Sequence, residues 1–122
     1  MLRVYSAALI IVMAASGGTH AAGCDNTAPQ SELNLCAARE YRTADALLNQ
    51  TYRRVVASLS SKQDTMSLLT AQRAWLTYRD EHCALAGRAF EGGSIQPLVV
   101  ADCLREVTMA RVEALETLIV EK

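Results

Sequence analysis

The residues of this sequence with the greatest potential for chemistry are four cysteines, Cys24, Cys36, Cys83 and Cys103. Zinc sites usually pair cysteines a few positions apart, whereas the smallest spacing here is twelve residues. A catalytic thiol is also disfavoured, because His82 and Cys83 are neighbours in sequence and point about 100° apart on a helix. An even number of cysteines in a short exported chain is instead typical of two disulfides, for which the sequence leaves three pairings open.

The other candidates for catalysis do not form a recognisable constellation. Asp80 and Glu81 are adjacent carboxylates, but on a helix they project from different faces and cannot act as an acid–base pair. The sequence contains no Ser-His-Asp set and no zinc-binding histidine pair, and Gly92-Gly93 is too short to cradle a phosphate. We therefore expect a protein that is not an enzyme and that uses neither a metal nor a cofactor.

Polar residues at helical spacing predict a network between two helices. Arg79 lies on the same helical stripe as Trp75 and Gln72, and buried polar groups of this kind need partners. An antiparallel hairpin centred near residue 62 would place Asp45 opposite Arg79 and allow an ion pair. We expect this network to fix the helix register, and a recognition site is the alternative. The predicted network comprises Asp45, Asn49, Gln72, Trp75 and Arg79.

Long stretches without helix breakers predict that helices carry these residues. Neither glycine nor proline occurs between Pro29 and Gly87, or after Pro97. Thr27 and Gln30 have the spacing of a capping box at the first helix start. Apolar residues recur at steps of three and four, so we expect helices over 28–59, 64–87 and 98–120, a turn at 60–64 and a loop at 92–97. The faces expected to point inward include Leu33, Ala37, Leu48 and Val55 in the first helix, Leu68, Leu69 and Trp75 in the second, and Val107, Ala110, Leu115 and Leu118 in the third.

Three helices with short connections are expected to form a small all-α bundle with up-down-up topology. In this topology Cys36 is early in the first helix, Cys83 late in the second and Cys103 early in the third, while Cys24 directly precedes the first helix. All four cysteines should therefore gather at one end of the bundle. We expect two disulfides at that end, with no covalent link at the other.

The first 21 residues resemble a secretory signal peptide. Arg3 supplies a positive charge, residues 7–15 are apolar, and a small-residue run ends at Ala21, where we expect cleavage. The apolar stretch is too short to cross a bilayer. An alternative is a lipoprotein box with Cys24 as the lipidated residue, but Ala21 stands where a larger aliphatic residue is usual. We expect Cys24 to carry no lipid anchor and residues 22–122 to form one periplasmic or secreted domain.

Charge and composition exclude two further classes. Without Arg3, the chain from residue 22 has 11 basic and 13 acidic residues, a net charge of −2. A protein so close to neutral lacks the electrostatic footprint of a nucleic-acid binder. The full sequence of 122 residues is 51% hydrophobic and 20% charged, which is incompatible with a wholly disordered chain.

Several motifs together resemble a known family. The most specific stretch is residues 71–83, AQRAWLTYRDEHC, which follows ADALLNQTY at 44–52 and QSELNLC at 30–36. With the Gly-Gly-Ser-Ile loop at 92–95 and the positions of the four cysteines, the chain looks like the LprI-type lysozyme-inhibitor family of small bacterial envelope proteins. The resemblance implies an exported protein that binds a muramidase, such as a chicken-type lysozyme, and protects the cell wall. A periplasmic structural or adaptor module that binds peptidoglycan or another envelope protein is the alternative.

The glycine-containing loop is the candidate contact with such an enzyme. Lysozyme's cleft holds two carboxylates, and a rigid loop that presents backbone N–H groups, a hydroxyl or an arginine could occupy it. The loop protrudes from the disulfide-bonded end of the predicted bundle, where it would be preorganised. The alternative is that it only turns the chain between helices. The candidate binding residues are Arg88, Gly92, Gly93, Ser94, Ile95 and Gln96.

Overall fold

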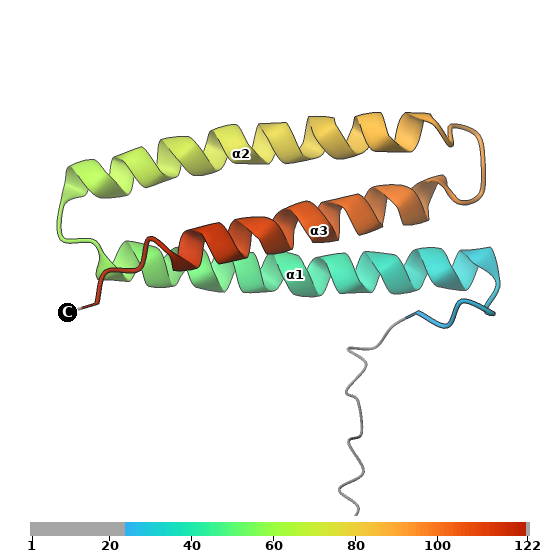
Figure 1. Ribbon diagram of the computed structural model, residues 1–122, viewed down its shortest axis with the longest axis horizontal. Helices are drawn as coiled ribbons and strands as arrows, with labels where there is room; N and C mark the ends of the chain where they lie inside the picture. Colours follow the sequence, from blue (N-terminus) through green and yellow to red (C-terminus); the bar gives the residue numbers. More distant parts are fainter. Residues whose placement is uncertain (1–23, 122) are drawn as a thin grey trace, which may run out of the picture.

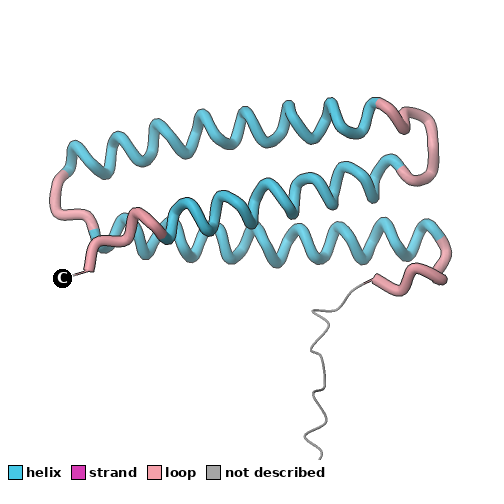
Figure 2. Tube along the Cα trace, in the orientation of Figure 1, coloured by secondary structure: helices cyan, strands magenta, loops and turns pink. Residues whose placement is uncertain are grey.

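A computed structural model describes residues 24–121, so the predicted signal peptide, residues 1–21, lies outside the described part of the chain. The described residues form three helices and no strand: α1 (Gln30–Ser58), α2 (Lys62–Arg88) and α3 (Gln96–Glu116). The helices run antiparallel in sequence, and α3 lies between α1 and α2 in the view of Figure 1. Short loops connect them at the two ends (Figure 2). The predicted all-α, up-down-up topology is confirmed.

The start of α1 differs from the prediction in its cap. Pro29 is the N-cap residue, and no side chain caps the helix. Thr27 is turned away from the helix, because its backbone N–H and its hydroxyl both donate to Asp25 Oδ1, at 3.0 and 2.7 Å. The predicted capping box of Thr27 with Gln30 is therefore wrong, and the fixed φ of Pro29 directs the chain into the helix instead.

The other helix boundaries shift by a few residues. α2 begins at Lys62, two residues before the predicted start, because Ser61 caps it: its hydroxyl oxygen accepts a hydrogen bond from the backbone N–H of Asp64 at 2.9 Å. α3 begins at Gln96, which puts Pro97 in its first turn, where the missing N–H costs nothing. α3 ends at Glu116, four residues before the predicted end.

The apolar core occupies the half of the bundle near the α1–α2 turn. α3 packs against both other helices, whereas α1 and α2 touch each other much less. Leu48 and Leu115 are completely buried there, and burial of each such side chain contributes about 1.5–3 kcal/mol. Three residues predicted to face inward are instead exposed: Leu69, Ala110 and Leu118. The buried core cluster comprises Leu48, Val55, Leu68, Val112 and Leu115.

Two disulfides close the opposite end. Cys24 bonds to Cys36, with a Cα–Cα distance of 5.7 Å, and Cys83 bonds to Cys103, with a Cα–Cα distance of 5.5 Å. The prediction of two disulfides at one end is confirmed, and one of the three possible pairings is selected. Only the second bond joins two different helices, because Cys24 precedes α1 and Cys36 lies within it.

Gly87 permits α2 and α3 to converge beside the second disulfide. It is buried, and a Cβ atom at this position would lie 2.5 Å from Val100 Cγ2. Any side chain larger than hydrogen would require Val100 on α3 to shift. The glycine that ends the long breaker-free stretch is therefore needed for close helix packing rather than for the turn itself.

Candidate functional site

Arg79 is the centre of a polar layer in the middle of the bundle. It is 7% exposed, and its Nη1 lies 3.3 Å from Asp45 Oδ1 on α1. Its Nε donates to Asp80 Oδ1 at 2.9 Å, and Nη1 also reaches Thr108 Oγ1 on α3 at 3.4 Å. One buried guanidinium thus contacts all three helices. This layer separates the apolar core from the disulfide-bonded end.

Aromatic rings enclose the same guanidinium. Its Cζ atom lies 5.5 Å from the centre of the Tyr41 ring and 5.2 Å from that of Trp75. Both distances allow cation–π attraction, which strengthens where water is excluded. Arg79 is therefore held by two carboxylates and two ring faces.

A second arginine, Arg111 on α3, extends the layer. Its Nε donates to Gln72 Oε1 at 2.9 Å, and its Cζ lies 5.9 Å from the Trp75 ring centre. Burial lowers the pKa of the Arg111 guanidinium, which nevertheless remains charged at neutral pH. The sequence-based network omitted Arg111, although its position three residues after Thr108 places both on one face of α3. Asn49, which the prediction included, is exposed, and its side chain makes no hydrogen bond within the described residues.

The pKa of the Tyr41 phenol should provide a measurable signal of this polar layer. Burial raises the pKa of its phenol above the ordinary value of 10.0, Arg79 opposes this shift, and Asp45 and Asp80 add to it. Because the pKa is higher in the folded than in the unfolded chain, the free energy of unfolding should fall as the pH rises above about 10. We expect the phenolate absorbance to include a late-titrating component from Tyr41. Tyr41→Phe should abolish that component, whereas Tyr78→Phe, at an exposed tyrosine, should leave it unchanged.

The α2–α3 loop, residues 89–95, is held by its own backbone. The N–H of Phe90 donates to Gly87 O at 3.0 Å, and the N–H of Gly93 donates to Phe90 O at 2.9 Å. Gly92 has a φ of +79°, a conformation that L side chains rarely adopt. The loop is also bonded to α1, because Asn34 Nδ2 donates to Ser94 O at 2.9 Å. These contacts preorganise the loop at the disulfide-bonded end.

The candidate loop residues occupy different positions in this structure. Arg88 is the last residue of α2 and is exposed, as are Gly92, Gly93 and Ser94. Ile95 is the exposed N-cap of α3, whereas Gln96 is partly buried in its first turn. The loop therefore brings five of the six predicted residues to the surface together.

Phe90 is a surface residue of this loop that the sequence-based interpretation missed. It is 43% exposed, and Leu35 on α1 is also exposed. A lone phenylalanine near a helix end is ordinarily expected in the core, so the residue type did not predict that this side chain is exposed. The available signal was its place between Gly87 and Gly92, just beyond the last helical turn of α2. Phe90 adds an apolar anchor to a loop that otherwise offers polar groups.

The remaining reactive side chains have structural partners. The His82 ring stacks on Tyr78, with their centres 5.3 Å apart. Cys24, Cys36 and Glu40 have ligand atoms within 4.8 Å of one another, but both sulfurs are in a disulfide and are not thiolates. Among the described residues, no helix is both long and apolar enough to cross a membrane.

The fold and its exposed loop define a small, disulfide-bonded, all-helical protein whose surface offers binding groups. The model of the family described as lysozyme inhibitor LprI matches residues 24–115, and the chain belongs to this family. It is also 41% identical to an uncharacterised protein of Rhizobium meliloti (strain 1021), over 107 residues that cover 78% of this chain and 77% of the relative. No solved structure matches the chain. The predicted family resemblance is confirmed, and with the disulfides it fits an extracytoplasmic, inhibitor-like protein.

Proposed function

We propose that this protein binds a muramidase through the α2–α3 loop and thereby protects the cell wall. The observation that carries the proposal is the loop itself, an exposed segment that backbone hydrogen bonds and the bond from Asn34 to Ser94 hold in one conformation. Binding then requires little further ordering, which preserves affinity. The family match to lysozyme inhibitors supports the choice of partner.

The loop offers two kinds of contact to an enzyme cleft. Phe90 presents apolar surface at the start of the loop, and buried aromatic anchors commonly dominate binding energy. Arg88 is exposed two residues earlier and has a charge suited to a cleft that holds two carboxylates. Occupation of that cleft would exclude the polysaccharide. The inhibitor needs no catalytic group of its own for this.

Export is part of the same proposal. We infer that residues 1–21 are removed after secretion and that residues 22–122 act as a single periplasmic or secreted domain. The two disulfides support an oxidising compartment. The bond from Cys24 to Cys36 uses the sulfur that a lipid would otherwise take, which supports a protein without that anchor.

Cell-wall lysis by a chicken-type lysozyme, titrated with the oxidised chain from Ala22 onward, tests the proposal. We expect stoichiometric inhibition and a complex with one copy of each protein. Phe90→Ala should weaken inhibition by about 10-fold to 100-fold, as expected for loss of an interface anchor. Leu47→Ala, at a similarly exposed apolar residue on α1, is the matched control and should inhibit normally.

Three outcomes would contradict parts of this function. Lack of inhibition at large molar excess would exclude this class of lysozyme as the target. Unchanged inhibition after replacement of residues 89–95 by a neutral linker would exclude the loop as the contact. Retention on insoluble peptidoglycan without any inhibition would favour the alternative, an envelope adaptor.

A further inference from the structure

The outer face of α2 has the pattern of a helix-pairing surface, and no other helix of the described residues covers it. Along α2, exposed residues recur at alternating steps of four and three, the spacing of a coiled-coil seam. One half of the seam has small side chains, and the other half has Tyr78 and Leu85, which are 55% and 61% exposed. The seam comprises Ser67, Ala71, Ala74, Tyr78, Glu81 and Leu85.

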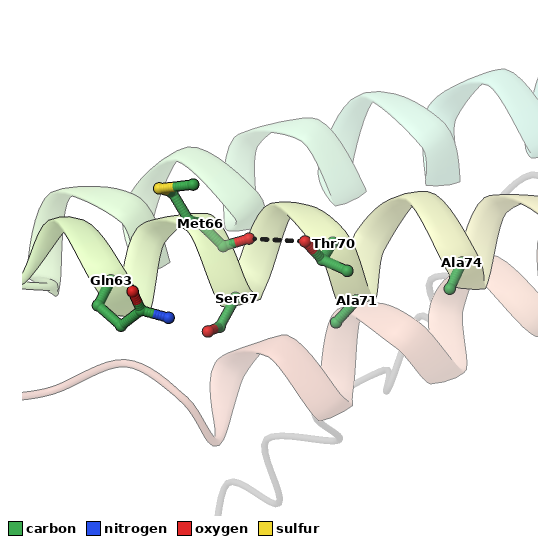
Figure 3. A pocket seen from close by; sticks show the side chains of 6 residues that line it. All are labelled: Gln63, Met66, Ser67, Thr70, Ala71 and Ala74. Atoms are coloured by element: carbon green, nitrogen blue, oxygen red, sulfur yellow. Dashed lines mark hydrogen bonds between the residues drawn. The ribbon is translucent and has the colours of Figure 1, made fainter.

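The surface of α2 is hollowed at the half of the seam that has small side chains. Ser67, Ala71 and Ala74 project from the same side of α2 (Figure 3). They line an open hollow of about 440 Å³, together with Gln63, Met66 and Thr70. All six residues that line this hollow belong to α2, so no other described helix closes over it.

We propose that this face binds a second copy of the chain, with the two α2 helices antiparallel. Positions whose numbers add to 152 then lie opposite each other across a twofold axis. Ala74 faces Tyr78 of the second copy, and Ser67 faces Leu85 of the second copy. Each of these layers pairs a small residue with a large one, as knobs-into-holes packing requires. The hollow of each copy thus receives Leu85 of the other, and the Tyr78 ring of the other copy packs at the Ala74 end of the hollow.

The charges on this face are compatible with the same register. Glu81, the one charged residue of the seam, lies level with Ala71 of the second copy, so no acidic group opposes it. Asp64 at one end of α2 lies level with Arg88 at the other end of the partner helix. A parallel arrangement would instead set Glu81 against Glu81 and Tyr78 against Tyr78. Size and charge therefore both select the antiparallel pair.

The expected dimer is weak. The seam spans residues 67–85, about 27 Å of helix, which gives a contact at the low end of specific interfaces. We expect a dissociation constant of roughly tens of micromolar. The α2–α3 loops, residues 89–95, lie beyond the seam at opposite ends of the dimer, so Phe90 remains exposed in both copies and the inference does not depend on lysozyme inhibition.

Sedimentation velocity of the chain from Ala22 onward, over a concentration series up to about 1 mM, tests the inference. We expect a monomer–dimer equilibrium for the parent. Ala74→Lys should raise the dissociation constant at least about tenfold, because its long side chain fills the space that the Tyr78 ring of the second copy must occupy. Ala46→Lys, at an exposed alanine of α1, is the matched control and should dimerise like the parent.

A mixing experiment tests the register. Tyr78→Glu should also remain monomeric alone, but mixed with Ala74→Lys it should form a heterodimer, because position 74 of one chain faces position 78 of the other. Circular dichroism checks that each variant is folded. A parent that stays monomeric throughout overturns the inference, as does a dimer that survives Ala74→Lys. Loss of lysozyme binding by Ala74→Lys in a monomeric parent would also overturn it and assign the face to the enzyme.

Discussion

Replacing Cys83 and Cys103 together by alanine is expected to lower the free energy of unfolding by about 3 kcal/mol. This bond closes a loop of 20 residues and joins α2 to α3. Without it, the unfolded chain gains the conformational freedom that the bond removes. Cys83 is also completely buried, so its truncation leaves a small cavity beside Gly87. Thermal unfolding followed by circular dichroism should show a decrease in Tm of at least about 10 °C.

The other disulfide is the matched control for this prediction. The bond from Cys24 to Cys36 closes a loop of similar size, 12 residues, so a loop-entropy account alone gives it almost the same value. However, the segment before α1 is mostly exposed and can detach while the helices stay packed. Its double alanine variant should lower Tm much less. Equal decreases in Tm for the two variants would show that the N-terminal segment folds together with the bundle.

The sequence was sufficient to predict the helices because their signals are local. The absence of glycine and proline from 30–86 and the apolar periodicity both depend only on neighbouring residues. The end of each helix was less predictable, because it depends on which side chain reaches which backbone group. Ser61 and Thr27 are both residue types that cap helices, yet only Ser61 does so, since Thr27 donates to Asp25 instead.

The polar layer was predictable only where a single hairpin determines the geometry. Counting from a turn near residue 62 is enough to set Asp45 opposite Arg79, and the structure places them 3.3 Å apart. Predicting the contact from Gln72 to Arg111 requires the position of α3 relative to α2. Counting residues along the hairpin of α1 and α2 does not give that position. The exposure of Phe90 likewise depends on how α2 ends and how α3 begins, and residue type alone indicates the opposite.

Arg79→Ala is expected to destabilise the fold by about 3 kcal/mol, whereas Asp45→Ala should cost only about 1 kcal/mol. The asymmetry follows from burial. Arg79 is enclosed by Tyr41 and Trp75, so its truncation removes packing and cation–π contacts together. The side chain of Asp45 is 39% exposed, and after its removal Asp80 still accepts a hydrogen bond from Arg79 at 2.9 Å.

A double-mutant cycle separates the ion pair from the packing. The double variant should be less destabilised than the sum of the two single variants by about 1 kcal/mol, measured by urea unfolding. Arg79→Met retains an apolar stem between the rings and removes the buried charge, so its stability should lie within about 1 kcal/mol of the parent. If Arg79→Met were as unstable as Arg79→Ala, the charge would be the main stabilising feature. If Asp45→Ala left Tm unchanged, the ion pair between α1 and α2 would contribute nothing. The packing of Arg79 between Tyr41 and Trp75, with its bond to Thr108, would then hold this layer in register.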